Sequence, residues 1–229
     1  FDGHDPARPH FPSWVQPDGH LVKALLPDAD VFAFGYAQTA PVTEVAAQPA
    51  LPAAVRWLRS AGYREVVLVG FSAGGLVARQ LVEDVPGLGV TKVVQVCAPN
   101  GGSSWAKVKT GLPAGQGPFV ESLTKAARAK WHEARRDRRV PDGVQFVCVV
   151  GTGLGVGDGV VTTRSQWPED LQRQGVPAVL LHTEHLRAVR TAEGAKVIAL
   201  LVREELPRWD AQQVAAMRRR MWGERAAKP

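Results

Sequence analysis

The residues best suited to a chemical reaction are the five from Gly70 to Gly74, which read Gly-Phe-Ser-Ala-Gly. They follow the apolar run Glu65–Val69 and precede Gly75–Val82, which has helical character. A serine in a tight turn between a buried strand and a helix has a strained backbone and an exposed hydroxyl at the edge of the sheet. We expect both flanking glycines to be required, because a side chain at either would collide with a neighbouring element. Ser72 is therefore the candidate nucleophile.

The carboxylate that such a serine needs is best supplied by Asp158. A serine hydroxyl is a weak nucleophile at neutral pH and requires a base, normally histidine, that a carboxylate orients. Asp158 lies in a glycine-rich loop after the apolar run Val144–Val150, where active-site groups of parallel sheets gather. Asp170 is the alternative, whereas Asp142 precedes its strand and would lie at the opposite end of the sheet. These glycines lack the G-x-G-x-x-G spacing of a dinucleotide site, so we expect no cofactor.

The favoured base is His185. It lies in the loop that opens the last long helix, where its ring could turn toward Ser72. His182 ends the apolar run Ala178–His182 and is the alternative, although it could simply be buried and hydrogen-bonded. His132 falls within a basic stretch and is expected on a helix surface.

Five short runs rich in valine predict buried strands, and helical stretches separate most of them. Such strands show little polar alternation because helices cover both faces of a parallel sheet. The sequence therefore predicts an α/β fold with a mostly parallel central sheet flanked by helices. The predicted strands are Val31–Tyr36, Glu65–Phe71, Thr91–Cys97, Val144–Val150 and Ala178–His182. The predicted helices are a late-starting one after Pro49 and Pro52 that stops near Gly62, then Leu76–Asp84 and Leu186–Arg203.

Two segments stand apart from this alternation. Residues 101–140 form an insertion that ends in a basic helix, roughly Phe119–Arg136, and is either a cap over a substrate cleft or a longer crossover. Residues 205–229 form a basic C-terminal helix and tail, with a helix-capping arrangement at Asp210 and an apolar stripe expected to pack on the edge of the domain. Residues 1–204 are then a single α/β domain.

These motifs resemble the lipase and esterase branch of the α/β-hydrolases, close to the GPI inositol-deacylase-like and related lipase-like proteins. The matching segments are Gly70–Arg79, Ala98–Ser103, Gly157–Val161 with Ser165 after it, and finally His185. The resemblance covers most of residues 1–203. The most specific match is the serine turn Gly70–Gly74, called the elbow below, with its Gly-Leu-Val-Ala-Arg extension. The later segments are individually weak matches but follow in the correct order.

The resemblance implies an α/β-hydrolase fold and cleavage of carboxylic esters through an acyl-enzyme on Ser72. His185 would act as general base and then acid, with Asp158 as the orienting carboxylate. In this family the three follow the order Ser, Asp or Glu, His, which leaves out His4, His10 and His20.

The resemblance also implies two backbone donors for an oxyanion. One is the N–H of Ala73, beside the nucleophile. The other follows a His-Gly dipeptide that ends a strand before the first helix. The chain begins Phe1-Asp2-Gly3-His4, which looks like the piece directly after that dipeptide, so Phe1 is the expected donor and the N-terminal strand is expected to be missing. Loss of one such donor costs about 10²–10³ in rate. Phe71 stands where this branch commonly has histidine, which should change packing rather than chemistry.

The net charge of +6 is concentrated in two arginine-rich runs, residues 135–139 and 218–220. Such runs can attract nucleic acid or anionic lipid, but no aromatic interleaving or nucleic-acid motif accompanies them. We expect a small-molecule or lipid ester as substrate, no nucleic-acid partner, and a weak association of the basic helices with an anionic membrane surface. The alternatives to ester hydrolysis are a binding or regulatory module without turnover and an acyltransferase with the same nucleophile.

The two cysteines, Cys97 and Cys148, lie in or at the end of β-branched runs. This placement is typical of small buried thiols rather than of a disulfide framework, and it favours a reducing, cytoplasmic type of compartment. No Cys/His spacing predicts a zinc site. The most apolar long stretch, residues 144–161, is interrupted by glycines and does not predict a membrane span.

Overall fold

The computed structural model describes residues 5–107 and 111–223. At its centre lies a four-stranded sheet whose strands are all parallel and follow the order β1-β2-β3-β4. The strands are β1 (Val67–Phe71), β2 (Lys92–Val96), β3 (Gln145–Gly151) and β4 (Ala178–Leu181). Because neighbouring strands run in the same direction, their carboxyl ends meet at one edge of the sheet, and the loops that leave this edge lie side by side.

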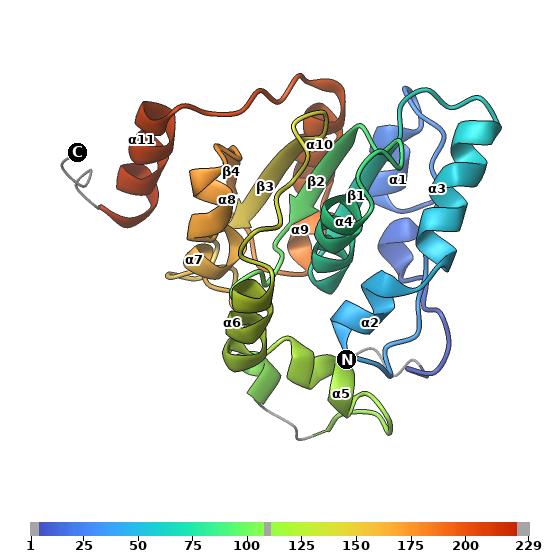
Figure 1. The fold of residues 1–229 in the computed structure, drawn as a ribbon, viewed down its shortest axis with the longest axis horizontal. Helices are drawn as coiled ribbons and strands as arrows, with labels where there is room; N and C mark the ends of the chain where they lie inside the picture. The colour runs from blue at the N-terminus through green and yellow to red at the C-terminus, as the bar shows by residue number, and fades with distance from the viewer. Residues whose placement is uncertain (1–4, 108–110, 224–229) are drawn as a thin grey trace.

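Helices cover both faces of this sheet, with α4 in front of it and α10 behind it in Figure 1. The face of the sheet that α4 covers also packs against α2, α3, α5 and α8. The face that α10 covers also packs against α1 and α9. The helices are α1 (His20–Leu25), α2 (Val42–Ala47), α3 (Ala50–Ser60), α4 (Ala73–Asp84), α5 (Gly117–Ser122), α6 (Lys125–Ala134), α7 (Thr163–Gln166), α8 (Glu169–Arg173), α9 (Arg187–Arg190), α10 (Ala192–Arg203) and α11 (Ala211–Trp222), with short 3-10 turns at Ser13–Val15 and Trp105–Lys107.

Two apolar cores result from the alternation of side chains along the strands. Phe146 and Cys148 of β3 face the core under α4, whereas Val147 and Val149 face the core under α10. All four side chains are at most 1 % exposed. The predicted α/β fold with a doubly covered parallel sheet is therefore confirmed.

Four of the five predicted strands are confirmed, within two residues at each end, and the fifth is wrong. Val31–Tyr36 forms no strand and pairs with no part of the sheet that the structure describes. A run of apolar residues becomes a strand only where another strand takes up its backbone N–H and C=O groups. Here Phe32 and Phe34 are 52 % and 41 % exposed, and the Phe32 ring meets Trp57 of α3 and Tyr63 edge-on at 6.1 and 5.5 Å.

Two long predicted helices are each broken in two by a threonine. Thr124 accepts a hydrogen bond from Ala127 N (3.2 Å) and begins α6, and Thr191 accepts one from Gly194 N (3.2 Å) and begins α10. A threonine hydroxyl that satisfies a free N–H starts a new helix more readily than it continues an old one. The helix predicted to start late begins at Ala50, because a proline is tolerated in the first turn, where Pro52 lies.

The insertion contains α5 and α6, which lie on the side toward which the strands run (Figure 1). Helix α6 packs against α4 through three arginine side chains that stack on Trp131. The guanidinium carbons of Arg79, Arg128 and Arg135 lie 5.2, 4.0 and 4.7 Å from the centre of its ring. Arg135, from the first basic run, turns inward and pairs with Glu83 at 3.1 Å.

The C-terminal helix α11 is present as predicted, with Asp210 and Gln213 forming a reciprocal capping box. Its apolar side chains pack against the core under α4, as expected, and they are Val214, Met217, Met221 and Trp222. The Trp222 indole N–H donates to Thr163 Oγ1 (2.8 Å), and its ring lies 5.9 Å from that of Trp167. Helix α11 is thereby attached to α7, which directly follows the loop that carries Asp158. Within the described ranges, no helix has both the length and the apolar character needed to cross a bilayer.

Candidate active site

Ser72 occupies a sharp turn between β1 and α4. It is the N-cap residue of α4, with φ 51° and ψ −124°. Residues other than glycine rarely adopt this backbone conformation. Its N–H bonds to Val96 O of β2 (2.8 Å), which ties the turn to the neighbouring strand. The predicted strained elbow is therefore present, and the hydroxyl lies at the carboxyl edge of the sheet.

The glycines around this elbow are not equally necessary. A Cβ on Gly70 would lie 2.7 Å from Gly74 O and Gly75 Cα, and one on Gly75 would lie 2.7 Å from Ala98 Cβ and Gln95 Cγ. A Cβ on Gly74 would meet only the Tyr36 hydroxyl, at 3.8 Å. The expectation that both flanking glycines are required is thus wrong for Gly74. It is Gly75, one position later, that lets α4 approach β2.

His185 joins Ser72 to the rest of the site. Its Nε2 lies 3.0 Å from Ser72 Oγ, and the residue is 8 % exposed. The ring packs against Phe71 with 4.8 Å between ring centres, and Phe71 in turn packs edge-on against Trp14. Phe71 therefore limits how the imidazole can turn. The alternative, His182, lies exposed just beyond the end of β4.

Asp158 lies behind the imidazole, with its side chain fully buried. Its Oδ2 is 2.7 Å from His185 Nδ1, and its Oδ1 accepts hydrogen bonds from Val160 N (2.9 Å) and Val161 N (2.7 Å). A close turn makes these bonds possible, since a Cβ on Gly157 would lie 2.1 Å from Val161 O. The carboxylate is thus held by fixed backbone donors while one oxygen faces the ring.

The structure brings together Ser72, His185 and Asp158 and leaves the other candidates elsewhere. Asp170 forms an ion pair with Arg79 of α4. Burial by itself would raise the pKa of its carboxyl, but the charges of Arg79 and His132 and the hydrogen bond from Arg79 together outweigh burial and lower this pKa. Asp142 precedes β3, at the other end of the sheet.

His132, which we expected on a helix surface, is instead partly buried. Its Nε2 lies 2.8 Å from Asn100 O, and burial lowers the pKa of its imidazole. Asn100 itself is completely buried and also bonds to Gln95 and to Gln166 O. It therefore joins the insertion to β2 and α7. Sequence reasoning matched Asn100 to a motif but gave it no role.

Of the two expected oxyanion donors, Ala73 provides the first amide of α4. The first N–H groups of a helix have no acceptor within the helix, and they lie at its partially positive end. This amide follows Ser72 directly and can reach an oxygen bound to a carbon at Ser72 Oγ. Phe1, the other expected donor, lies outside the described residues.

Cys97 is a neighbour of the site that the sequence did not single out. Its Sγ, a carboxylate oxygen of Asp158 and a ring nitrogen of His185 all lie within 4.8 Å of one another. Three such groups could in principle hold a metal ion, but metals bind thiolate. Burial, followed by the charge of Asp158, raises the pKa of the Cys97 thiol and opposes that form.

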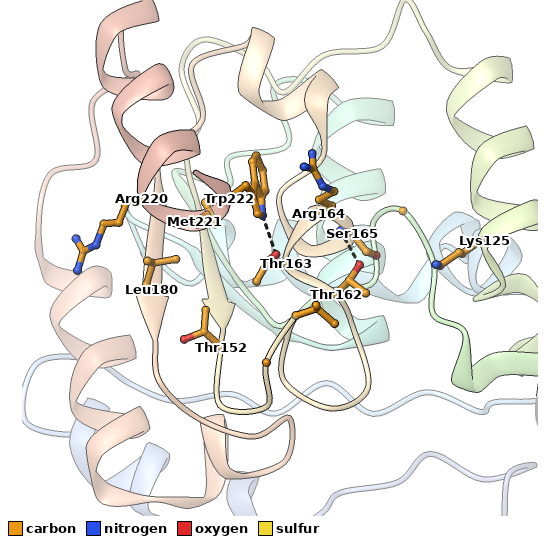
Figure 2. A pocket seen from close by; sticks show the side chains of 13 residues that line it. Lys125, Thr152, Thr162, Thr163, Arg164, Ser165, Leu180, Arg220, Met221 and Trp222 are labelled. Carbon is orange, nitrogen blue, oxygen red and sulfur yellow. Dashed lines mark hydrogen bonds between the residues drawn. The ribbon is translucent and has the colours of Figure 1, made fainter. Parts of the chain in front are cut away.

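A separate hollow of about 810 Å³ lies between α7, α11 and the edge strand β4 (Figure 2). Its lining includes Thr152, Leu180 and Trp222 but neither Ser72 nor His185. Figure 2 shows the Arg220 guanidinium directed away from Trp222. It also shows the hydrogen bond that the Trp222 indole N–H donates to the Thr163 hydroxyl. The hollow is therefore distinct from the Ser72 site.

No protein-family model and no curated protein sequence matches this chain. Solved structures do match it. A mature lipase from Bacillus licheniformis superposes with a TM-score of 0.60 at 16 % identity, over 88 % of this chain and 93 % of that one. A metagenomic carboxyl esterase gives 0.52 at 14 % identity, over 71 % and 61 % of the two chains. A Listeria innocua gene product gives 0.53 at 16 % identity, over 77 % and 76 %. The chain thus has the α/β-hydrolase fold, and its structural neighbours include a lipase and an esterase.

Proposed function

We propose that this protein is a serine hydrolase that cleaves carboxylic esters through an acyl-enzyme on Ser72. The observation that carries the proposal is the continuous hydrogen-bonded path from Ser72 Oγ through the His185 ring to the Asp158 carboxylate. The same three residue types in this geometry recur on unrelated folds that perform acyl transfer. The lipase and the esterase among the structural neighbours support the same reaction class.

The first half of the reaction forms the acyl-enzyme. Ser72 Oγ attacks the carbonyl carbon of the ester while His185 Nε2 takes its proton, and the carbonyl oxygen becomes an oxyanion that the Ala73 N–H stabilises. The buried Asp158 carboxylate stabilises the imidazolium that forms. The carbon–oxygen bond of the alcohol then breaks, and His185 returns the proton to the leaving alkoxide.

The second half releases the acid. A water molecule loses its proton to His185 Nε2 and attacks the acyl carbon, and a second oxyanion forms at the same place. Its collapse breaks the bond to Ser72 Oγ, which regains the proton from His185. An alcohol that replaced water at this step would make the protein an acyltransferase.

The surface around the site favours esters with apolar substituents. The loops after β2, β3 and β4 expose large apolar side chains close to the residues that hold Asp158 and His185. Leu186 directly follows His185, and Val160 donates its N–H to Asp158. These exposed side chains are Trp105, Leu154, Val160 and Leu186, with exposed fractions between 38 % and 61 %. We infer that they border the site and contact an acyl or alkyl chain of the substrate.

A fluorophosphonate probe tests the proposal directly, because it reacts only with an activated serine. We expect labelling of the wild type, loss of labelling in Ser72→Ala, and full labelling in Ser104→Ala, a control at an exposed serine of the loop after β2. Turnover of p-nitrophenyl esters, with and without an added alcohol, then separates hydrolysis from transfer. Absence of labelling in the folded wild type would contradict the proposal and favour a binding module without turnover.

A further inference from the structure

Gln166, the last residue of α7, bonds to both ends of the Asp158 loop, which is the segment 152–162 between β3 and α7. The residue is 1 % exposed. Its amide oxygen Oε1 accepts a hydrogen bond from Gly151 N (2.7 Å), and its amide nitrogen Nε2 donates to Gly151 O (3.2 Å) and to Val161 O (2.9 Å). Because Gly151 ends β3 and Val161 lies near the end of the loop, one side chain links the start of this loop to its end.

Both residues that Gln166 bonds are also in contact with Asp158. Val161 N donates to Asp158 Oδ1 (2.7 Å), and Val161 O accepts from Asp158 N (3.2 Å) as well as from Gln166. Gly151 lies against the Asp158 side chain, since a Cβ on Gly151 would be 2.7 Å from Asp158 Cβ. The two backbone segments that contact Asp158 are therefore connected through one amide group.

The Gln166 amide suits this set of partners. A primary amide offers two N–H donors and one carbonyl oxygen, and here they meet two carbonyl oxygens and one N–H. The orientation of the amide follows, because the Gly151 N–H can only donate and must face the oxygen. The backbone of Gln166 is held as well, since its N–H donates to Thr162 O (3.0 Å) and its C=O accepts from Asn100 Nδ2 (3.0 Å).

We propose that Gln166 is a positioning residue that fixes the place of the Asp158 carboxylate opposite His185. The proposal rests on the proposed function of this site. Gln166 acts through the Val161 peptide, whose N–H holds Oδ1 while Oδ2 lies 2.7 Å from His185 Nδ1. The loop contains four glycines, which have more backbone freedom than other residues, so its shape depends on such bonds. Without the amide, Gly151 and Val161 could shift relative to each other, and the carboxylate would shift with them.

The test uses two substitutions of Gln166 in the full chain. Gln166→Met has a side chain of similar length and removes all three hydrogen bonds. Gln166→Glu keeps an acceptor for Gly151 N. Burial raises the pKa of such a carboxyl, and below that pKa the protonated group also keeps one donor. Gln166→Glu is therefore the milder change, and it carries the test if Gln166→Met does not fold.

Gln174→Met is the matched control. The Gln174 side chain also bridges two backbone segments, since its Oε1 accepts from Val140 N (2.9 Å) and its Nε2 donates to Asp170 O (3.1 Å). Val140 precedes β3, so this bridge lies toward the end of the strand opposite to Gly151. Loss of backbone bonds by itself should then lower stability in both methionine variants, whereas a loss of rate should be specific to Gln166.

We expect Gln166→Met to lower kcat for a p-nitrophenyl ester by about 10- to 100-fold with KM nearly unchanged, because a small displacement of a catalytic group costs rate. Gln166→Glu should lose less at about pH 6, where its carboxyl is protonated. Gln174→Met should keep the wild-type kcat. A wild-type kcat in folded Gln166→Met would overturn the proposal. Equal losses in Gln174→Met, or in Gln166→Glu and Gln166→Met, would also overturn it.

A spectroscopic measurement separates this proposal from the proposed function. The proton between His185 Nδ1 and Asp158 gives a low-field NMR signal that does not require turnover. We expect this signal to move in both Gln166 variants and to stay in place in Gln174→Met. A wild type without esterase activity but with this pattern would contradict ester hydrolysis and support the role of Gln166. An unmoved signal in the Gln166 variants would overturn that role.

Discussion

Asp158 and His185 are joined twice. The His185 backbone N–H donates to Asp158 O (2.9 Å), and the two side chains meet at 2.7 Å between Nδ1 and Oδ2. The loops after β3 and β4 are also joined nearby, where Gly153 N bonds to Thr183 O (2.9 Å). The acid and the base of the site therefore belong to one cross-linked unit, and their relative position does not depend on side-chain torsions alone.

Removal of either partner of this pair should abolish most activity without unfolding the protein. We expect Asp158→Asn to lower kcat by roughly 10⁴-fold, because the imidazole loses its orienting carboxylate, and His185→Ala to lower it by roughly 10⁶-fold, because the base itself is removed. The controls are Asp142→Asn, at the opposite end of the sheet, and His182→Ala, exposed three residues from His185. Steady-state ester hydrolysis measures the effect. Equal losses in His182→Ala and His185→Ala would show that the base is misassigned.

The elbow glycines give a second prediction. Gly70→Ala should destabilise the protein by about 1–3 kcal/mol, because the added methyl group would collide with the backbone of α4. Gly74→Ala should remain within about 0.5 kcal/mol of the wild type, because alanine suits a helix and its methyl group meets only the Tyr36 hydroxyl. Urea unfolding measures both free energies. Similar losses in the two variants would mean that the turn does not have the described geometry.

The stack of arginines on Trp131, between α4 and α6, gives a third prediction. Arg79 is 2 % exposed and pairs with Glu83 and Asp170, so Arg79→Met should lower the free energy of unfolding by about 3–5 kcal/mol, because Glu83 would keep only Arg135 as a cation and Asp170 would lose its guanidinium partner. Arg136→Ala removes an exposed pair with Glu133 and should cost about 0–0.5 kcal/mol. Chemical denaturation measures the free energy of unfolding of both variants and of the wild type. A small effect in Arg79→Met would show that the ion pairs contribute little.

His132 should make stability depend on pH. Burial lowers the pKa of its imidazole below the unfolded value near 6.5, and the charges of Arg79 and Arg128 add to this against the opposing charge of Asp170. Between the two values the unfolded chain binds more protons, so this contribution to stability is complete above the unfolded value and is lost as pH falls toward the folded one. The urea concentration at the midpoint of unfolding should therefore decrease when the pH is lowered from about 7.5 to about 5.5. The decrease should be smaller in His132→Gln. Identical pH dependence in both proteins would contradict this.

The sequence predicted those parts of the structure that depend on local pattern. The valine-rich runs identified all four strands, and the order of parallel strands then placed the loops of Asp158 and His185 beside Ser72. Val31–Tyr36 was mistaken for a strand because apolar content does not say whether a partner strand is available. The breaks at Thr124 and Thr191 were missed because a capping hydroxyl inside an apolar pattern looks like any other helical residue.

Contacts between distant segments were beyond the sequence. Cys97 looked like a buried thiol, and it is buried and free, but its neighbour Asp158 is 61 residues away and meets it only because β2 and β3 pair. His132 looked like a surface residue because its stretch is basic, whereas Asn100 and the arginine stack draw it inward. Gly74 belonged to the motif, yet a Cβ there would make only one ordinary contact, with the Tyr36 hydroxyl at 3.8 Å, and only the path of α4 could reveal this.

Trp222 hydrogen-bonds Thr163 and packs on Trp167, and both residues follow closely after the loop that holds Asp158. Indole fluorescence depends on its immediate surroundings, so the emission of this side chain reports on α7, the helix that follows the Asp158 loop. Substitutions in α11 that displace Trp222 would accordingly change an optical signal from the neighbourhood of α7, about fifty residues earlier in the chain.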